Sequence, residues 1–172
     1  PSAERPWVLF PGSFASDEPV QELVEVAKNM PEVSFFMTGS LEKAKKVIDV
    51  RALPSNFHLM GFLPIQEFDE LLGVSNVILA LTKFDGIQLS VCNEAVGAKK
   101  AMVLSNTSLL KALFPQGTIF VDPLSVRSMQ EGIEEALQNQ CELEKKMEAF
   151  LQVRWRTWRD QANRVKNRLA VI

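Results

Sequence analysis

The sequence predicts an α/β fold built on a doubly wound parallel sheet. Short apolar runs of strand length alternate along the chain with segments of helical period, which is the pattern of βαβ units. The run at 77–81 is almost entirely apolar, as expected of a central strand that helices cover on both faces. With 172 residues and 47% hydrophobic content, the chain can bury one substantial core, so a single domain over 1–172 is expected.

The other strands are expected at the remaining apolar runs of strand length. They lie at 7–10, 33–37, 56–60, 101–104 and 118–121. The helices are expected in the segments between these runs where apolar residues recur at helical spacing. They lie at about 19–27, 41–52, 65–73, 108–114 and 125–137, with a further helix after 77–81 and a long polar helix from about 141 toward the C-terminus at 172.

Capping residues and turns support some of these boundaries. Ser16 or Asp17 is expected to cap the first helix, which has Pro19 in its first turn. Ser125 is expected to cap the helix at 125–137 in the same way. The turn 38–40 follows the second strand and is large enough to hold a phosphate.

The loops that follow the strands are the candidate ligand site, because open α/β sheets bind ligands outside the carboxyl ends of their strands. The loops expected to open on this edge are Gly12-Ser13-Phe14, Gly39-Ser40, Gly61-Phe62-Leu63, Asp85-Gly86-Ile87 and Ser105-Asn106. Glycine allows a ligand to approach the backbone closely, but it is also a common turn residue, so each glycine alone supports either interpretation. Several glycines on one edge favour a ligand site.

The segment 84–95 carries the most specific signal. Its sequence, F-D-G-I-Q-L-S-V-C-N-E-A, predicts a strand end, a glycine turn and the start of a helix. The unpaired N–H groups and the dipole at the start of a helix favour an anion such as a phosphate. The turn also places an acid, Asp85, beside this anion site.

The spacing of these residues resembles the donor-site motif of retaining group 1 (family 4) glycosyltransferases of the GT-B type, S-x-x-E-G-F-x-L-x-x-x-E-A-M-A-x-G-K-P-V-V. The positions that fall on this frame are Thr82, Asp85, Gly86, Ile87, Leu89, Asn93, Glu94, Ala95, Val96, Lys99 and Lys100. Outside the motif, the first-strand loop at Pro11-Gly12-Ser13, the segment 56–62, the strand end at 120–123 and Trp158 resemble further family segments in the same order. The chain as a whole therefore resembles the C-terminal, nucleotide-sugar-binding half of such an enzyme.

The resemblance implies a role for each matching position. Asp85 would bind hydroxyls of the donor sugar, the N–H groups of about Ile87 to Leu89 would hold the distal phosphate, and Asn93 would face the ribose. The implied donor-binding set is Gly12, Ser13, Gly61, Phe62, Leu63, Lys83, Asp85, Gly86, Ile87, Gln88, Leu89 and Asn93. The resemblance implies no catalytic residue in this half, no cofactor other than the nucleotide-diphosphate sugar used as substrate, and no metal, in agreement with the absence of a DxD carboxylate pair from the sequence.

The chain departs from the family at two places. Asn93 stands where the family has a Glu, and a neutral amide lacks the charge-assisted bond that a carboxylate makes to a diol. The family also has an Arg and a Lys after its first strand, whereas 13–18 contains no cation and two acids. Because such cations stabilise the leaving diphosphate, Lys83 or Lys99 must substitute for them, or this half is catalytically weak.

Composition and charge limit the partners. The net charge of −2 gives no general attraction to nucleic acid or to an anionic membrane. Two cysteines far apart in sequence suit a reducing, cytoplasmic compartment, and no apolar run is long enough to span a membrane. His58, the only histidine, lies in a strand pattern and is interpreted as a structural or exposed residue rather than a general base.

The C-terminal segment 141–172 is expected to form a basic helix with a net charge of +4. Its main interpretation, which the resemblance implies, is the family's terminal helix, which packs toward a separate N-terminal, acceptor-binding domain, since amphipathic helices generally bury one face against protein. Because the chain begins with Pro1 rather than Met and a strand follows almost at once, a domain cut from a longer polypeptide is also expected. Contact with anionic lipid at the inner face of the membrane, through Trp155 and Trp158, stays open as an alternative.

Two function classes compete with a glycosyltransferase half that binds a nucleotide-sugar donor for transfer to a glycan or lipid acceptor. One is a degenerate domain of the same fold that serves as a non-catalytic interaction module, which the missing cations and Asn93 favour. The other is a nicotinamide or flavin dehydrogenase domain. It requires G-x-G-x-x-G after the first strand, which the Gly12-Ser13-Phe14 loop does not supply.

Overall fold

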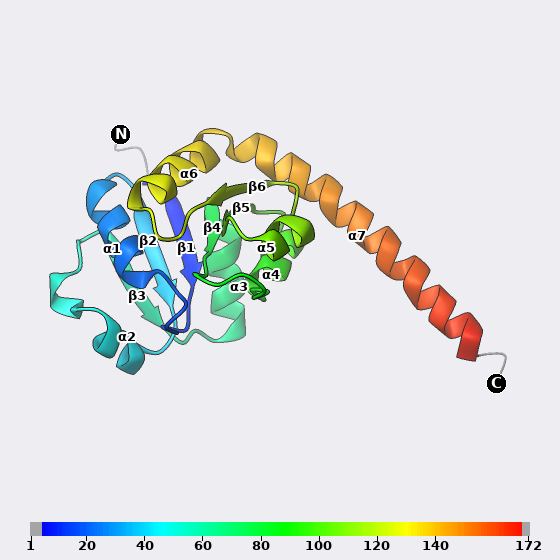
Figure 1. Ribbon diagram of the computed structural model, residues 1–172, viewed down its shortest axis with the longest axis horizontal. Coiled ribbons are helices and arrows are strands. Elements are labelled where there is room, and N and C mark those ends of the chain that lie inside the picture. Colours follow the sequence, from blue (N-terminus) through cyan, green and yellow to red (C-terminus); the bar gives the residue numbers. More distant parts are fainter. Residues whose placement is uncertain (1–4, 170–172) are drawn as a thin grey trace.

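The computed structural model describes residues 5–169 and contains a parallel sheet in the order β3-β2-β1-β4-β5-β6 (Figure 1). The strands are β1 (Trp7–Pro11), β2 (Ser34–Thr38), β3 (Phe57–Gly61), β4 (Val77–Ala80), β5 (Ala101–Ser105) and β6 (Thr118–Val121). The helices are α1 (Val20–Asn29), α2 (Leu41–Val47), α3 (Ile65–Val74), α4 (Val91–Gly97), α5 (Ser108–Leu113), α6 (Val126–Gln138) and α7 (Gln140–Leu169), with a short 3₁₀ helix at Val50–Ala52. The doubly wound parallel sheet predicted from the sequence is confirmed.

Helices cover both faces of the sheet, and the core follows this division. Side chains of α1 and α6 pack on one face, and side chains of α3, α4 and α5 pack on the other. The four residues of β4 are all buried and alternate between the two faces, with Val77 and Leu79 on the first face and Ile78 and Ala80 on the second. The apolar run at 77–81 therefore does contain a central strand that is covered on both faces, and this strand ends at Ala80, one residue earlier than predicted.

The structure corrects two helix predictions. α1 begins at Val20, and Pro19 at its N-cap makes no side-chain capping bond, so neither Ser16 nor Asp17 caps this helix. The segment 41–52 is not one helix, because the backbone is extended at Ile48 (φ −134°, ψ 152°) and the Asp49 carboxylate accepts a bond from Arg51 N. Ser125 does cap α6, as predicted, since its side chain accepts a hydrogen bond from Ser128 N.

β3 begins at Phe57, one residue later than predicted, and the residue before it, Asn56, contacts the backbone through its side chain. This side chain is 3% exposed, and its Nδ2 lies 2.9 Å from Ala27 O, 2.9 Å from Met30 O and 2.8 Å from Val33 O. Asn56 thus supplies donors to carbonyl groups at the end of α1 and in the turn into β2. It holds the helix, the turn and the edge strand together.

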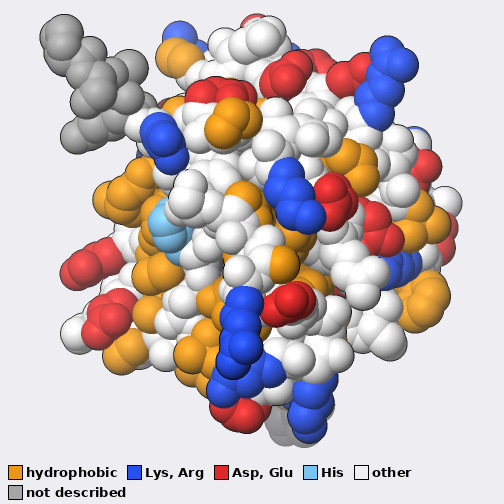
Figure 2. All heavy atoms as spheres, turned by 90° about the vertical axis from the view of Figure 1, so that its left-hand side faces the viewer, with side chains coloured by type: hydrophobic (Ala, Val, Ile, Leu, Met, Phe, Trp, Pro, Cys, Tyr) orange, Lys and Arg blue, Asp and Glu red, His pale blue; other side chains and the backbone are white. Residues whose placement is uncertain are grey.

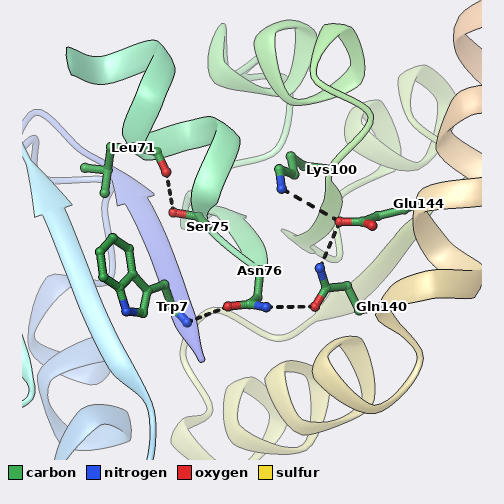
Figure 3. A network of polar contacts seen from close by, with 7 residues as sticks. All are labelled: Trp7, Leu71, Ser75, Asn76, Lys100, Gln140 and Glu144. Atoms are coloured by element: carbon green, nitrogen blue, oxygen red, sulfur yellow. Dashed lines mark hydrogen bonds and ion pairs between the residues drawn. The ribbon is translucent and has the colours of Figure 1, made fainter. Parts of the chain in front are cut away.

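A polar network at the amino edge of the sheet anchors the start of α7 (Figure 3). Trp7 N donates to Asn76 Oδ1 at 2.8 Å, Asn76 Nδ2 donates to Gln140 Oε1 at 3.0 Å, and Gln140 Nε2 donates to Glu144 Oε1 at 2.9 Å. Lys100 Nζ approaches the same Glu144 oxygen at 3.9 Å. These contacts join β1, the chain before β4 and α7 on the side opposite the candidate site.

From this anchor α7 passes along α4 in the antiparallel direction, as its contacts with that segment show. It then projects away from the domain (Figure 1). Lys99 Nζ, just after the end of α4, lies 2.7 Å from Glu148 Oε1, and further along α7 Arg154 Nη2 lies 2.9 Å from Oδ1 of Asn93, near the start of α4. Beyond Arg154 the helix has little cover, since Trp155 and Trp158 are 57% and 61% exposed. The predicted C-terminal helix is confirmed as far as Leu169, and the last part of the predicted range 141–172 lies outside the described residues.

At the other end of the sheet, His58 lies at the surface of the edge strand β3, with hydrophobic side chains around it (Figure 2). Its ring stacks on Phe36 of β2 with a centroid distance of 4.9 Å, and Phe36 contacts Trp7 of β1 at 4.5 Å. His58 thus takes part in an aromatic row across three strands. This position is distant in the sheet order from β4, which leads into the candidate motif.

None of the described helices is both long and apolar enough to cross a membrane.

Candidate functional site

The loops after β1, β2 and β3 meet at the carboxyl edge of the sheet. Gly39 N donates to Gly61 O at 2.9 Å, and a Cβ on Gly39 would lie 2.5 Å from Gly12 O. Gly39 has φ +120°, so both its conformation and this close approach require glycine. The structure therefore brings the predicted residues Gly12 and Gly61 together. The neighbouring Phe62 is 82% exposed on this edge.

The β1 loop holds an internal anion. The Glu18 carboxylate accepts hydrogen bonds from Ser13 N at 2.8 Å, from Phe14 N at 2.8 Å and from the Ser13 hydroxyl at 2.8 Å. Phe14 has φ +57°, in the left-handed region, and this conformation lets two successive N–H groups point at one carboxylate. The predicted site residue Ser13 is thus bonded to Glu18, a contact that the sequence pattern did not predict.

The β1 and β4 loops are joined where the strand order changes direction between β1 and β4. Thr82 Oγ1 donates to Asp17 Oδ2 at 2.9 Å, and Lys83 N donates to Asp17 O at 2.7 Å. The fully buried hydroxyl of Ser105 accepts from Thr82 N at 2.8 Å, so β5 is connected as well. Asp17 is therefore used to link the two loops rather than to cap α1.

The lysines predicted as substitutes for the family's cations are engaged elsewhere. Lys83 Nζ lies 3.7 Å from Glu22 Oε1 on α1, and both side chains are about one quarter exposed. Lys99 pairs with Glu148 on α7. As placed, both ammonium groups therefore have a carboxylate of the chain as their partner.

Asp85 connects the motif loop to α5. Its Oδ1 accepts from Gly86 N at 2.8 Å and from Leu109 N at 3.3 Å, and its Oδ2 accepts from Ser108 N at 3.2 Å. These backbone donors, with Gly86 first, lower the pKa of the Asp85 carboxyl below its usual value, because they favour the charged form. The carboxylate is exposed and retains further acceptor capacity, since each oxygen carries two lone pairs.

The N–H groups predicted to hold a phosphate lie in a loop, not at the start of a helix. α4 begins at Val91, and Ser90 at its N-cap makes no side-chain capping bond, so Ile87 to Leu89 precede the helix. Within the described residues 5–169, the N–H groups of Ile87, Gln88 and Leu89 donate no hydrogen bond to the protein. The donors are therefore available, but the helix dipole invoked for them acts from at least one residue further along.

Arg154 is a site residue that the sequence did not reveal. It donates through Nη2 to Asn93 Oδ1 at 2.9 Å, and its guanidinium lies 5.5 Å from the centroid of Phe114 and 5.7 Å from that of Phe150. Its Nη1 is buried without a partner among the described residues. No local pattern pairs Arg154 with Asn93, because the two residues are 61 positions apart and meet only where α7 crosses α4.

The sheet order, the glycine loops at its carboxyl edge and the Asp85-Gly86 turn together define a Rossmann-like domain of the GT-B type. The sequence model described as "Glycosyl transferases group 1" matches residues 2–151, and the chain belongs to this family. No match was found among curated proteins.

Solved structures show the same fold at low sequence identity. Sucrose-phosphate synthase from Thermosynechococcus elongatus matches 96% of this chain with a TM-score of 0.78 and 17% identity. An Anabaena protein solved in complex with UDP and glucose matches 87% with a TM-score of 0.73 and 13% identity, and a glycosyltransferase from Rickettsia africae matches 87% with a TM-score of 0.72 and 17% identity. The matches cover 46%, 44% and 42% of those chains, respectively, which is less than half of each.

Proposed function

We propose that this chain binds a nucleotide-sugar donor at the carboxyl edge of its sheet, as the donor half of a retaining glycosyltransferase. The observation that carries the proposal is the exposed Asp85 carboxylate beside the unpaired N–H groups of Ile87, Gln88 and Leu89. An acceptor for sugar hydroxyls thus lies next to donors for a phosphate, which is the pair of functions that a sugar diphosphate requires. Membership in the group 1 family supports the same assignment.

In this proposal each group has a defined task. Asp85 accepts hydrogen bonds from sugar hydroxyls while Gly86, Ser108 and Leu109 keep it ionised and in place. The 87–89 amides bind the distal phosphate. Asn93, held by Arg154, contacts the ribose, and its amide nitrogen remains available as a donor. The loops that contain Gly12 and Gly61 allow the base and ribose to approach the backbone.

The acceptor side of the reaction is proposed to lie in a separate N-terminal domain that binds a glycan or lipid. The chain spans less than half of the solved structures that it matches, and the exposed part of α7 offers a surface for such a domain. The free cysteines, one buried and one exposed, are consistent with a cytoplasmic location. Peripheral contact with the inner face of a membrane, through Trp155 and Trp158, is part of the same proposal.

A second function is supported by the occupied loop after β1. Glu18 accepts hydrogen bonds from the N–H groups of this loop, and Lys83 and Lys99 are paired with acids. The groups that would stabilise a leaving diphosphate thus already have partners within the chain. These contacts favour a domain that keeps the fold and serves as a non-catalytic interaction module. The two functions differ in whether a nucleotide binds.

A thermal-shift and calorimetric screen with UDP, GDP, ADP and their sugar conjugates decides between the two. A ligand at about a hundred times its dissociation constant stabilises the protein by about 2.7 kcal/mol. We expect one nucleotide diphosphate to stabilise the chain and its sugar conjugate to bind more tightly only when Asp85 is present. Asp85→Ala is compared with Asp69→Ala, which removes the same charge from the exposed face of α3. No shift with any nucleotide at millimolar concentration would favour the interaction module.

A further inference from the structure

The loop after β1 has the geometry of an anion site. Ser13 N lies 2.8 Å and 3.1 Å from the two carboxylate oxygens of Glu18, Phe14 N lies 2.8 Å from Oε2, and the Ser13 hydroxyl lies 2.8 Å from Oε1. Two backbone amides and one hydroxyl therefore converge on one carboxylate. Consecutive N–H groups arranged in this way form a concavity that binds phosphates and other oxyanions in many proteins.

The surroundings hold this loop in shape. Phe14 adopts φ +57°, which is unfavourable for a residue with a Cβ, and its side chain is buried in the core at 6% exposure. A Cβ on Gly12 would lie 2.5 Å from Met37 Cε and 3.1 Å from Glu18 Oε2, so Gly12 leaves room for both groups. The contacts of Asp17 with the β4 loop attach the far end of the segment.

The loop also lies where a ligand can reach it. It follows β1, next to β4 in the sheet, and the carboxyl ends of these two strands flank the point at which the strand order reverses. Ser13 is exposed, and the Glu18 side chain is only partly buried. An anion bound at the 87–89 loop would therefore have this second set of donors on the same edge of the sheet.

We propose that Glu18 is the residue that determines which ligands the β1 loop accepts, because its carboxylate occupies the loop's anion site and excludes a free phosphate or diphosphate. An external anion must compete with a carboxylate that is part of the same chain and therefore present at high effective concentration. It must also approach the negative charge of that carboxylate. If the proposed function holds, the diphosphate of the nucleotide-sugar donor is bound by the 87–89 loop and not by the β1 loop.

The test compares Glu18→Ala with the natural chain, using pyrophosphate as the probe. Binding is measured by calorimetry, and the amide resonances of Ser13 and Phe14 are followed by NMR. Glu18→Ala vacates the loop, so we expect it to bind pyrophosphate at least about tenfold more tightly than the natural chain, with both amide resonances shifted on binding. Glu25→Ala on α1 removes the same charge from an exposed site and is expected to behave like the natural chain.

Two results would overturn the proposal. One is a Glu18→Ala chain that keeps the native melting behaviour and binds pyrophosphate no more tightly than the natural chain. The other is an equal gain in Glu25→Ala, which would mean that only net charge matters. If Glu18→Ala does not fold, Glu18→Gln replaces it, because the amide keeps the shape and one acceptor oxygen but loses the charge. Its expected gain is smaller, and the lack of any gain in a folded chain is the overturning result.

The outcome can be separated from that of the donor-site proposal. If Glu18→Ala gains pyrophosphate binding through Ser13 and Phe14 while no nucleotide perturbs the 87–89 amides, the Glu18 assignment stands and the donor site fails. If a nucleotide binds with dependence on Asp85 while Glu18→Ala gains nothing, the donor site stands and the Glu18 assignment fails.

Discussion

Replacing Asn56 with alanine should strongly destabilise the protein, because it removes a buried donor from three backbone carbonyl groups. Ala27 O and Met30 O keep a bond from Met30 N and Val33 N, whereas Val33 O loses the donor that the Asn56 amide supplies. The Asn56 amide serves Ala27 O, Met30 O and Val33 O at 2.8 to 2.9 Å from a position that is 3% exposed. A buried polar group left unsatisfied costs about 1 to 3 kcal/mol, which applies to Val33 O, and a lost hydrogen bond costs about 1 kcal/mol, which applies to the other two carbonyls. The expected loss in the free energy of unfolding is therefore roughly 3 kcal/mol in total. For a chain of this size, that corresponds to a fall in Tm of about 6 to 12 °C.

Asn56→Asp tests the reason for this loss. At neutral pH the new carboxylate would face carbonyl oxygens without a donor, so this variant should be less stable than Asn56→Ala. Burial and the carbonyls raise the pKa of such an Asp in the folded state, so its deficit should shrink as the pH is lowered toward the unfolded value of about 3.9. Urea unfolding at several pH values measures both effects, and Asn163→Asp on the exposed face of α7 is the control.

The reasoning would be refuted by an Asn56→Asp variant that is as stable as Asn56→Ala at neutral pH, or by a loss of less than about 1 kcal/mol in Asn56→Ala. Either result would mean that these carbonyl groups find other donors, such as water, when the amide is removed. The link between α1, the turn and β3 would then depend on apolar packing alone.

Changes at an acid, two thiols and two glycines test other parts of the structure. Asp85→Ala should lower the urea midpoint at neutral pH, and the difference in midpoint from the natural chain should narrow below about pH 4. The reason is that the pKa of the Asp85 carboxyl is lowered in the folded state. Such a carboxylate stabilises the fold above its unfolded pKa and loses that effect as the pH falls through the folded pKa. Iodoacetamide should modify the exposed Cys141 in the folded protein and Cys92 only after unfolding, as detected by mass spectrometry, because burial raises the pKa of the Cys92 thiol to about 12. Gly132→Ala should destabilise the protein by about 1 to 3 kcal/mol, because the new Cβ would clash with β6. Gly73→Ala should stabilise it by about 0.5 to 1 kcal/mol, because the new Cβ on α3 would meet no other atom. Thermal unfolding measures both effects.

The sequence predicted the core elements more accurately than the details of the candidate site. β6 occupies 118–121 as predicted, β4 is central and Ser125 caps α6, because apolar periodicity and a cap act within a few residues. The prediction of one helix over 41–52 is wrong because Asp49 offers the backbone a local alternative to the helix. The motif helix starts at Val91, so the anion donors at 87–89 belong to a loop.

The sequence by itself determined the order of the elements, the two covered faces of the sheet and the loops that meet at its carboxyl edge, since these depend on patterns of neighbouring residues. Only the tertiary structure decided what the polar side chains of the site contact. Asp17 meets Thr82 over 65 positions, Asp85 meets Ser108 over 23 and Arg154 meets Asn93 over 61. A charged side chain takes the partner that the packing of distant elements brings within reach, and no local pattern carries that information.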